Sequence, residues 1–168
     1  ACCSLAGAQE ISKTWVADKG NGTYQNPVLH ADYSDPDVCA AGDDFYMTAS
    51  SFNCIPGIPI LHSNDLVNWS LVNYALPIQE PEEFFDKAQH GKGVWAPAIR
   101  FHNGEFYIYW GDPDYGIYMI KTKDPKGKWS KPVLVKAGKG MIDATPLWDE
   151  DGKVYLIHAY AGSRSGVN

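Results

Sequence analysis

The sequence predicts an all-β protein assembled from propeller blades, and a repeated hairpin is the main reason. An apolar residue is followed eight positions later by tyrosine in Val38–Tyr46, Ile99–Tyr107 and Leu147–Tyr155. A turn rich in Gly, Asp or Asn separates the two residues each time, as in a β-hairpin. Repeats of about 40–60 residues made of short strands are typical of propeller blades. The 168 residues therefore cover roughly the first two to three blades.

Nearly every predicted element is a strand. The first two repeats continue to the pairs Trp69-Ser70 and Trp129-Ser130, whereas the third reaches Asn168 before such a pair. One short helix is expected over residues 81–87, where proline and acidic residues suit a first turn. The stretch 75–94 lacks strand character and is expected to loop over one end of the molecule. Strands are expected over residues 37–40, 44–50, 58–63, 70–74, 98–102, 105–111, 115–121, 132–135, 145–148 and 153–159.

Composition restricts the class of protein. Hydrophobic residues make up 45% of the chain and aromatic residues 13%, which is enough for a core and argues against disorder. A net charge of −6 without a Lys/Arg cluster excludes a nucleic-acid partner and favours a neutral substrate. Arg100 and Arg164 are the two arginines that could clamp an anionic group. No apolar run approaches the ~20 residues that a membrane-spanning helix needs.

Residues 1–22 are interpreted as a signal-peptide remnant or an N-terminal tail, and residues 23–168 as an incomplete propeller domain. Ala6-Gly7-Ala8 suits a signal-peptidase site, whereas Cys2 would be the lipidated residue of a lipoprotein signal. We therefore expect a secreted or periplasmic protein, with a lipid anchor to the cell envelope as the alternative.

Cys39 and Cys54 allow two interpretations. Neighbouring blades could join them as a disulfide in an oxidising compartment, or both could be free thiols. The chain contains no Cys-x-x-Cys or His-x-x-x-His spacing that would suggest zinc.

Two acidic residues occupy corresponding places in the repeats. Asp35 opens the first repeat and Asp143 opens the third. Equivalent positions on successive blades point towards one axis, so these two carboxylates are expected to converge on a single pocket. Convergent carboxylates in an aromatic-rich cleft are what glycoside hydrolysis requires. The alternative for Asp35 is a purely structural Asp-Pro turn.

Several motifs, in order along the chain, resemble the opening of glycoside hydrolase family 43. They are Asn26–Leu29, Ser34–Cys39, Gly42–Met47, Ser51-Phe52, Ile55–Ile60, His62–Trp69, Gly93–Pro97 and Asp149–Lys153 followed by Tyr155-Leu156. The resemblance runs from about residue 24 to the end. It implies a five-bladed β-propeller whose active site lies at one end of the central channel. It also implies an inverting, exo-acting hydrolase that releases xylose or arabinofuranose from plant cell-wall hemicellulose or arabinan.

The resemblance also assigns roles to individual residues. It implies that Asp35 is the general base and that Asp143 orients the general acid and raises its pKa. The acid itself would be a glutamate beyond Asn168. Phe52 and Trp95 match positions that pack on the sugar. No cofactor or metal ligand is expected; a calcium ion or a water-linked His can occupy the family's channel, but no residue here indicates one.

The expected partners are an oligosaccharide or polysaccharide substrate and the remainder of the same polypeptide, which would complete the propeller. Three positions depart from the family's pattern: Asp37 replaces a commoner Ser, Ala98 stands where Asp or His is frequent, and Ala144-Thr145 replaces Pro-Ser or Pro-Asn. The alternative function is a non-catalytic carbohydrate-binding propeller, or an inactive fragment that lacks the acid.

Two other propeller classes fit less well. The turns within residues 63–69 and 122–129 resemble sialidase-type Asp boxes, but the glycine is missing from the first and misplaced in the second. A protein-interaction propeller of the WD type would need Trp-Asp and Gly-His punctuation in each repeat.

Overall fold

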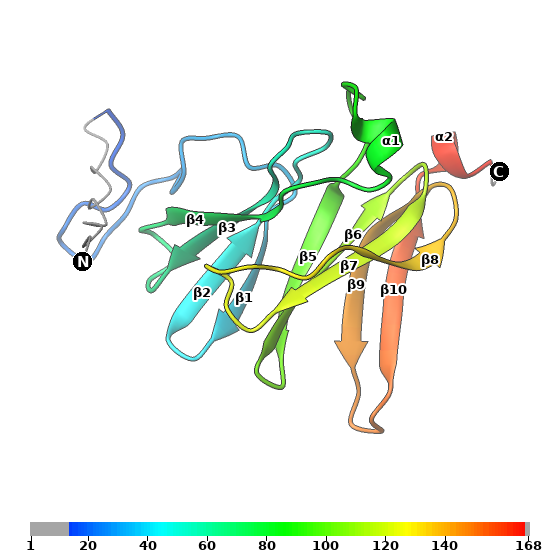
Figure 1. The fold of residues 1–168 in the computed structure, drawn as a ribbon. Coiled ribbons are helices and arrows are strands. Elements are labelled where there is room, and N and C mark those ends of the chain that lie inside the picture. The colour runs from blue at the N-terminus through cyan, green and yellow to red at the C-terminus, as the bar shows by residue number, and fades with distance from the viewer. Residues whose placement is uncertain (1–13, 167–168) are drawn as a thin grey trace, which may run out of the picture.

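The computed structural model describes residues 14–166, which form three antiparallel sheets (Figure 1). The predicted signal features, Cys2 and Ala6-Gly7-Ala8, lie outside the described residues. The first sheet has the order β1 (Asp37–Ala41), β2 (Asp44–Thr48), β3 (Gly57–Ser63), β4 (Ser70–Leu76). The second has the order β5 (Trp95–His102), β6 (Glu105–Asp112), β7 (Gly116–Thr122), β8 (Val133–Ala137). The third pairs β9 (Met141–Trp148) with β10 (Val154–Tyr160).

Each predicted strand is present, which confirms the all-β class. The largest errors are at the starts of β5 and β9, which begin at residues 95 and 141 where 98 and 145 were predicted. In both strands the missed residues precede or include an irregularity in the pairing register. Such an irregularity breaks the two-residue alternation by which a strand is recognised in a sequence.

The helical content is small and lies at one end of the sheets. The predicted helix over 81–87 is present as α1 (Glu82–Phe85), and a second one-turn helix, α2 (Gly162–Ser165), was not predicted. Figure 1 shows both helices at one end, with the β1–β2, β5–β6 and β9–β10 turns at the other. Within residues 14–166, no helix has the length and apolar character needed to cross a bilayer.

The first strands of the three sheets lie side by side. β1 contacts β5, and β9 packs against both β5 and β6 of the second sheet (Figure 1). Between the first two sheets lies a core that includes the fully buried Ile60, Ile99 and Ile108. We call β1, β5 and β9, the first strand of each sheet, the inner strands.

A glycine permits the close approach of the third sheet to the second. A Cβ atom at Gly111 of β6 would lie 2.6 Å from the carbonyl oxygen of Met141 on β9. Met141 and Ala144 also bury their side chains against Ile117 of β7. Any larger residue at position 111 would push away the part of β9 that contains Asp143.

The repeated tyrosines hold equivalent places in the three hairpins. Tyr46 pairs with Cys39, Tyr107 with Arg100 and Tyr155 with Leu147. The partner is seven residues before the tyrosine in the first two hairpins and eight in the third. The β9–β10 turn, residues 149–153, is also longer than the two-residue turns of the other two hairpins.

The two cysteines within the described residues are free thiols. Cys39 is buried on β1 and Cys54 is exposed in the loop before β3. Burial raises the pKa of Cys39 to about 12, so this thiol stays protonated at neutral pH. The structure therefore agrees with the interpretation that Cys39 and Cys54 are free thiols and not with a disulfide between them.

Candidate active site

One extra residue interrupts the regular pairing within β5, within β9 and just before β1, each time at the end of the sheets that carries α1 and α2. On β5, residues 96–97 lie opposite a single residue of β6, and on β9 residues 143–144 lie opposite a single residue of β10. The segment before β1 has the same offset, because the hydrogen bond from Ser50 N to Ser34 O (3.0 Å) leaves residues 35–36 opposite one residue. β-bulges of this kind turn a side chain into a new direction.

The first residue of each bulge has a positive φ. The values are 51° at Asp35, 35° at Ala96 and 55° at Asp143. This conformation costs an L-residue about 1–2 kcal/mol, and Asp is one of the residues that tolerate it best. The structure therefore places Asp35 and Asp143 at equivalent positions of the first and third sheets, with Ala96 at the same position of the sheet between them.

Ser50 connects Asp35 to the second sheet. Its hydroxyl donates to Asp35 Oδ2 (2.6 Å) and accepts a hydrogen bond from Ala96 N (2.8 Å). The Asp35 carboxylate is exposed, yet its orientation is fixed through Ser50 by the backbone of β5. Composition and spacing gave no signal for Ser50, because its partners lie 15 and 46 residues away.

The two predicted sugar-binding aromatics lie beside this connection. Phe52 and Val94 exchange backbone hydrogen bonds of 3.0 and 3.1 Å, so Phe52 is held next to the residue that precedes Trp95. The Phe52 side chain is 36% exposed. The Trp95 indole is half-buried and donates from Nε1 to Gly91 O (3.0 Å). Phe52 pairs with Val94 and Ser50 ties Asp35 to Ala96, so Trp95 lies between the two residues that these bonds engage.

Asp143 reaches the same end of the molecule from the third sheet. Its side chain is exposed, whereas the next residue, Ala144, is fully buried against the second sheet. Burial of Ala144 anchors the bulge without the proline that is usual there. Asp35 and Asp143 lie on opposite sides of β5, which is the strand between β1 and β9.

Neither arginine is an unoccupied clamp for an anionic group. Arg100 Nη1 bonds Asp37 Oδ2 (2.5 Å), and Arg164 Nη1 bonds Asp114 Oδ1 (3.0 Å). The Arg164 guanidinium also lies 5.9 Å from the centroid of the Trp95 ring, within the range of a cation–π contact. Both cations are thus already paired with carboxylates, which fits a neutral ligand.

One carboxyl group near Trp95 lies fully inside the protein. Asp112, at the end of β6, is 0% exposed, and its Oδ1 accepts a hydrogen bond from Asp114 N (2.9 Å). Its Oδ2 is buried without a hydrogen-bond partner among the described residues. Burial raises the pKa of Asp112 to about 6, because removal from water disfavours the charged form.

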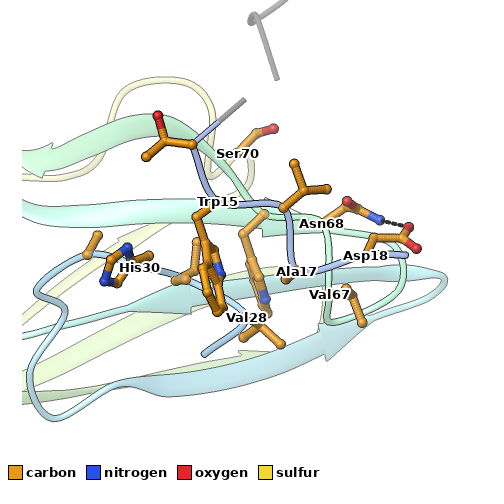
Figure 2. A pocket seen from close by; sticks show the side chains of 13 residues that line it. Trp15, Ala17, Asp18, Val28, His30, Val67, Asn68 and Ser70 are labelled. Carbon is orange, nitrogen blue, oxygen red and sulfur yellow. Dashed lines mark hydrogen bonds between the residues drawn. The ribbon is translucent and has the colours of Figure 1, made fainter. Parts of the chain in front are cut away.

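A cavity of about 810 Å³ lies elsewhere, between residues 14–31 and the loop before β4. Figure 2 shows Trp15, Val28 and His30 among its lining residues, together with the hydrogen bond from Asn68 Nδ2 to Asp18 Oδ2 (2.8 Å). Neither Asp35 nor Asp143 lines this cavity. Within residues 14–166, no group of three or more His, Cys, Asp or Glu side chains could hold a metal ion.

The profile described as glycosyl hydrolases family 43 matches residues 24–168. This chain belongs to glycoside hydrolase family 43. The match covers both bulge aspartates, Ser50 and the two aromatic residues, so the whole candidate site lies within the family's domain.

Curated relatives of this family 43 chain are much longer than the chain itself. A protein from Formosa agariphila named beta-xylosidase is 38% identical over 165 residues, which cover 94% of this chain and 28% of that protein. A Bacteroides ovatus protein named non-reducing end alpha-L-arabinofuranosidase BoGH43B is 37% identical over 149 residues, covering 85% of this chain and 28% of its own length. The chain therefore spans little more than a quarter of either relative.

Solved structures share the fold of this family 43 chain. The crystal structure of the Bacillus licheniformis family 43 protein BlXynB matches with a TM-score of 0.71 and 32% identity, over 81% of this chain and 29% of that one. A Bacteroides ovatus structure entitled Xyloglucan PUL GH43B matches with a TM-score of 0.68 and 32% identity, over 80% and 27% of the two chains.

Replacing Asp112 by Asn is expected to stabilise the protein at neutral pH. The raised pKa means that the folded state binds more protons than the unfolded state between about pH 4 and pH 6. The contribution of Asp112 to stability is therefore fully present below pH 4 and is lost as the pH rises through 6. At pH 7 the neutral Asn avoids the cost of a buried charge, a gain of about 1–3 kcal/mol.

The measurement is urea unfolding of the wild-type protein, Asp112→Asn and the exposed control Glu150→Gln at pH 4 and pH 7. The difference between Asp112→Asn and wild type should grow with pH, whereas the control should show no such trend. Equal differences at both pH values would mean that Asp112 has an ordinary pKa.

Proposed function

We propose that this chain is the N-terminal part of the catalytic domain of an inverting, exo-acting hydrolase that releases xylose or arabinofuranose from plant cell-wall polysaccharides. One observation carries the proposal: Asp35, just before β1, and Asp143, on β9, occupy the same bulge position of the first and third sheets. Glycoside hydrolysis by inversion needs a carboxylate base and a protonated carboxyl acid on either side of one bond. Asp35 would supply the base, and Asp143 the negative charge that keeps the acid protonated.

Asp35 is the general base in this proposal. The Ser50 hydroxyl donates to Oδ2, which orients the carboxylate and leaves Oδ1 to draw a proton from the attacking water. The hydrogen bond from Ala96 N makes Ser50 a rigid support, because it ties the hydroxyl to the neighbouring inner strand. A fixed carboxylate keeps the water in line with the anomeric carbon, which is worth a large part of the rate.

Asp143 acts on the general acid by charge and orientation. A carboxylate close to a second carboxyl group raises the pKa of that group, so the acid stays protonated near neutral pH. The acid is a glutamate in a later part of the polypeptide. Glu105 is unsuited to this role because its hydrogen bond from Lys121 Nζ (3.0 Å) lowers its pKa, and Glu150 lies in the β9–β10 turn at the far end.

The sugar is proposed to stack on Phe52 and Trp95. The C–H groups on one face of a pentose pack well on an aromatic ring, and both rings adjoin the Ser50–Ala96 connection to Asp35. Relatives named for xylosidase and for arabinofuranosidase activity have similar identity to this chain. We accordingly propose the class of pentosides as substrates, without choosing between the two sugars.

The complete domain is proposed to be a five-bladed propeller in which the three sheets are successive blades. The side-by-side inner strands support this arrangement. The third sheet also exposes large apolar residues: Leu147, Val154, Tyr155, Ile157 and Tyr160 are between 44% and 56% exposed. Further strands of the same polypeptide would bury this surface and complete the third blade.

Asp35→Asn should abolish turnover by the full-length protein. The amide cannot accept a proton from water, so kcat is expected to fall at least about 10³-fold on aryl-xylosides and aryl-arabinofuranosides. The matched control is Asp43→Asn, which makes the same change in the turn at the opposite end of the sheets. Unchanged turnover by Asp35→Asn would remove Asp35 as the base. An inactive wild-type protein that still binds the sugars would favour the non-catalytic alternative.

Asp143→Asn should retain some activity and change its pH dependence. Loss of the negative charge lowers the pKa of the general acid, so the limb of the pH–rate profile that reports the acid moves to lower pH. The test is kcat/KM between pH 4 and pH 9 for wild type and variant on one aryl-pentoside. If that limb stays in place, Asp143 does not act on the acid.

A further inference from the structure

Three side chains join the inner strands of all three sheets. Arg100 on β5 extends its guanidinium between β1 and β9. On one side Arg100 Nη1 bonds Asp37 Oδ2 (2.5 Å), and the same Asp37 oxygen accepts from Ile99 N (2.7 Å). On the other side Arg100 Nη2 donates to Thr145 Oγ1 (2.9 Å). We refer to Asp37, Arg100 and Thr145 as the interstrand link.

The link is attached close to both aspartates at the site. Asp37 follows Asp35 by two residues on the first inner strand, and Thr145 follows Asp143 by two residues on the third. Both short connections pass through a bulge, where the backbone departs from regular pairing and the neighbouring sheet no longer fixes it completely. The position of each aspartate therefore depends on where the interstrand link holds the strand beside it.

We propose that Arg100 is a positioning residue for the reaction: through Asp37 and Thr145 it sets the separation of Asp35 and Asp143. The inference rests on the proposed function. A guanidinium is suited to the task because it is planar, keeps its charge, and holds donors in a fixed fork. Nη1 and Nη2 face different strands, so a shift of either strand strains or breaks one of the two bonds.

The link has a structural counterpart closer to the end of the sheets. Ser50 joins Asp35 to Ala96 N in the bulge of β5. Arg100 lies further along the same strand, beyond that bulge. The segment that contains Asp35 is consequently attached to β5 at two points, through Ser50 and through Asp37. The segment of β9 that contains Asp143 is attached to β5 by the side-chain hydrogen bond between Arg100 and Thr145. Loss of the Thr145 hydroxyl should for this reason move Asp143 more than Asp35.

The test compares Thr145→Val with Thr145→Ser in the full-length protein. Valine keeps the shape of threonine but cannot accept from Arg100, whereas serine keeps the hydroxyl. For Thr145→Val we expect kcat on an aryl-pentoside to fall about 10-fold or more, with a smaller change in KM, because misplaced groups lose transition-state stabilisation. Thr145→Ser should stay within about 2-fold of wild type, as rescue by a conservative variant requires.

Lys121→Met is the control for a merely structural ion pair. It removes the Lys121–Glu105 pair (3.0 Å) beside the β5–β6 turn, at the end of the sheets away from the site. It should leave kcat and KM unchanged. If Thr145→Val also leaves kcat unchanged, or if Thr145→Ser loses as much activity as Thr145→Val, the positioning role is wrong.

Crystal structures of the two Thr145 variants test the link even without turnover. The distance between the carboxyl carbons of Asp35 and Asp143 should change by more than about 0.5 Å in Thr145→Val and remain as in wild type in Thr145→Ser. An unchanged distance in Thr145→Val would overturn the inference. A wild-type protein that turns over no aryl-pentoside would instead contradict the proposed function, and the two failures are thereby separate.

Discussion

A β-bulge of one extra residue at each inner strand determines how Asp35 and Asp143 are oriented at the end of the sheets that carries α1 and α2. A regular strand would alternate its side chains between the two faces of its sheet, and neither Asp35 nor Asp143 would be turned as it is. The bulge requires a positive φ, which is costly, and the surrounding structure maintains it. Ser50 holds the first bulge against Ala96, and buried Ala144 holds the third against the second sheet. Two of the three strained bulge positions carry a carboxylate, and backbone strain of this kind is common at functional sites.

The close contact between the sheets fixes the positions of these bulges relative to one another. Gly111 lets the backbone of β9 approach β6, and the apolar core between the first two sheets holds β1 against β5. Polar bonds then fix the finer placement, since Arg100 connects to Asp37 on one side and Thr145 on the other. Packing therefore sets which strands are neighbours, and a small number of directional bonds sets how far apart their side chains lie.

The sequence predicted the strands well because hairpins have local signals. The tyrosine spacing and the Gly- and Asp-rich turns located the strands, and the corresponding places of Asp35 and Asp143 in the repeats singled out these two acids. The resemblance to family 43 assigned their roles and added the aromatic residues. Ser50 and the interstrand link were missed because their bonds span between 15 and 63 residues, and nothing local marks them. Arg100 was interpreted as a possible anion clamp, whereas its partner is Asp37. Asp37 and Thr145 looked like departures from the family's pattern, and the fold shows that one arginine binds both.

A crystal structure of the full-length protein with a bound pentose tests the central claim most directly. The account predicts that the sugar lies on Phe52 and Trp95, with Asp143 lining the same pocket. It also predicts that an Asp35 carboxylate oxygen lies about 3 Å from a water molecule in line with the anomeric carbon. A sugar bound at another place on the molecule, or carboxylates of Asp35 and Asp143 that face separate pockets, would contradict it.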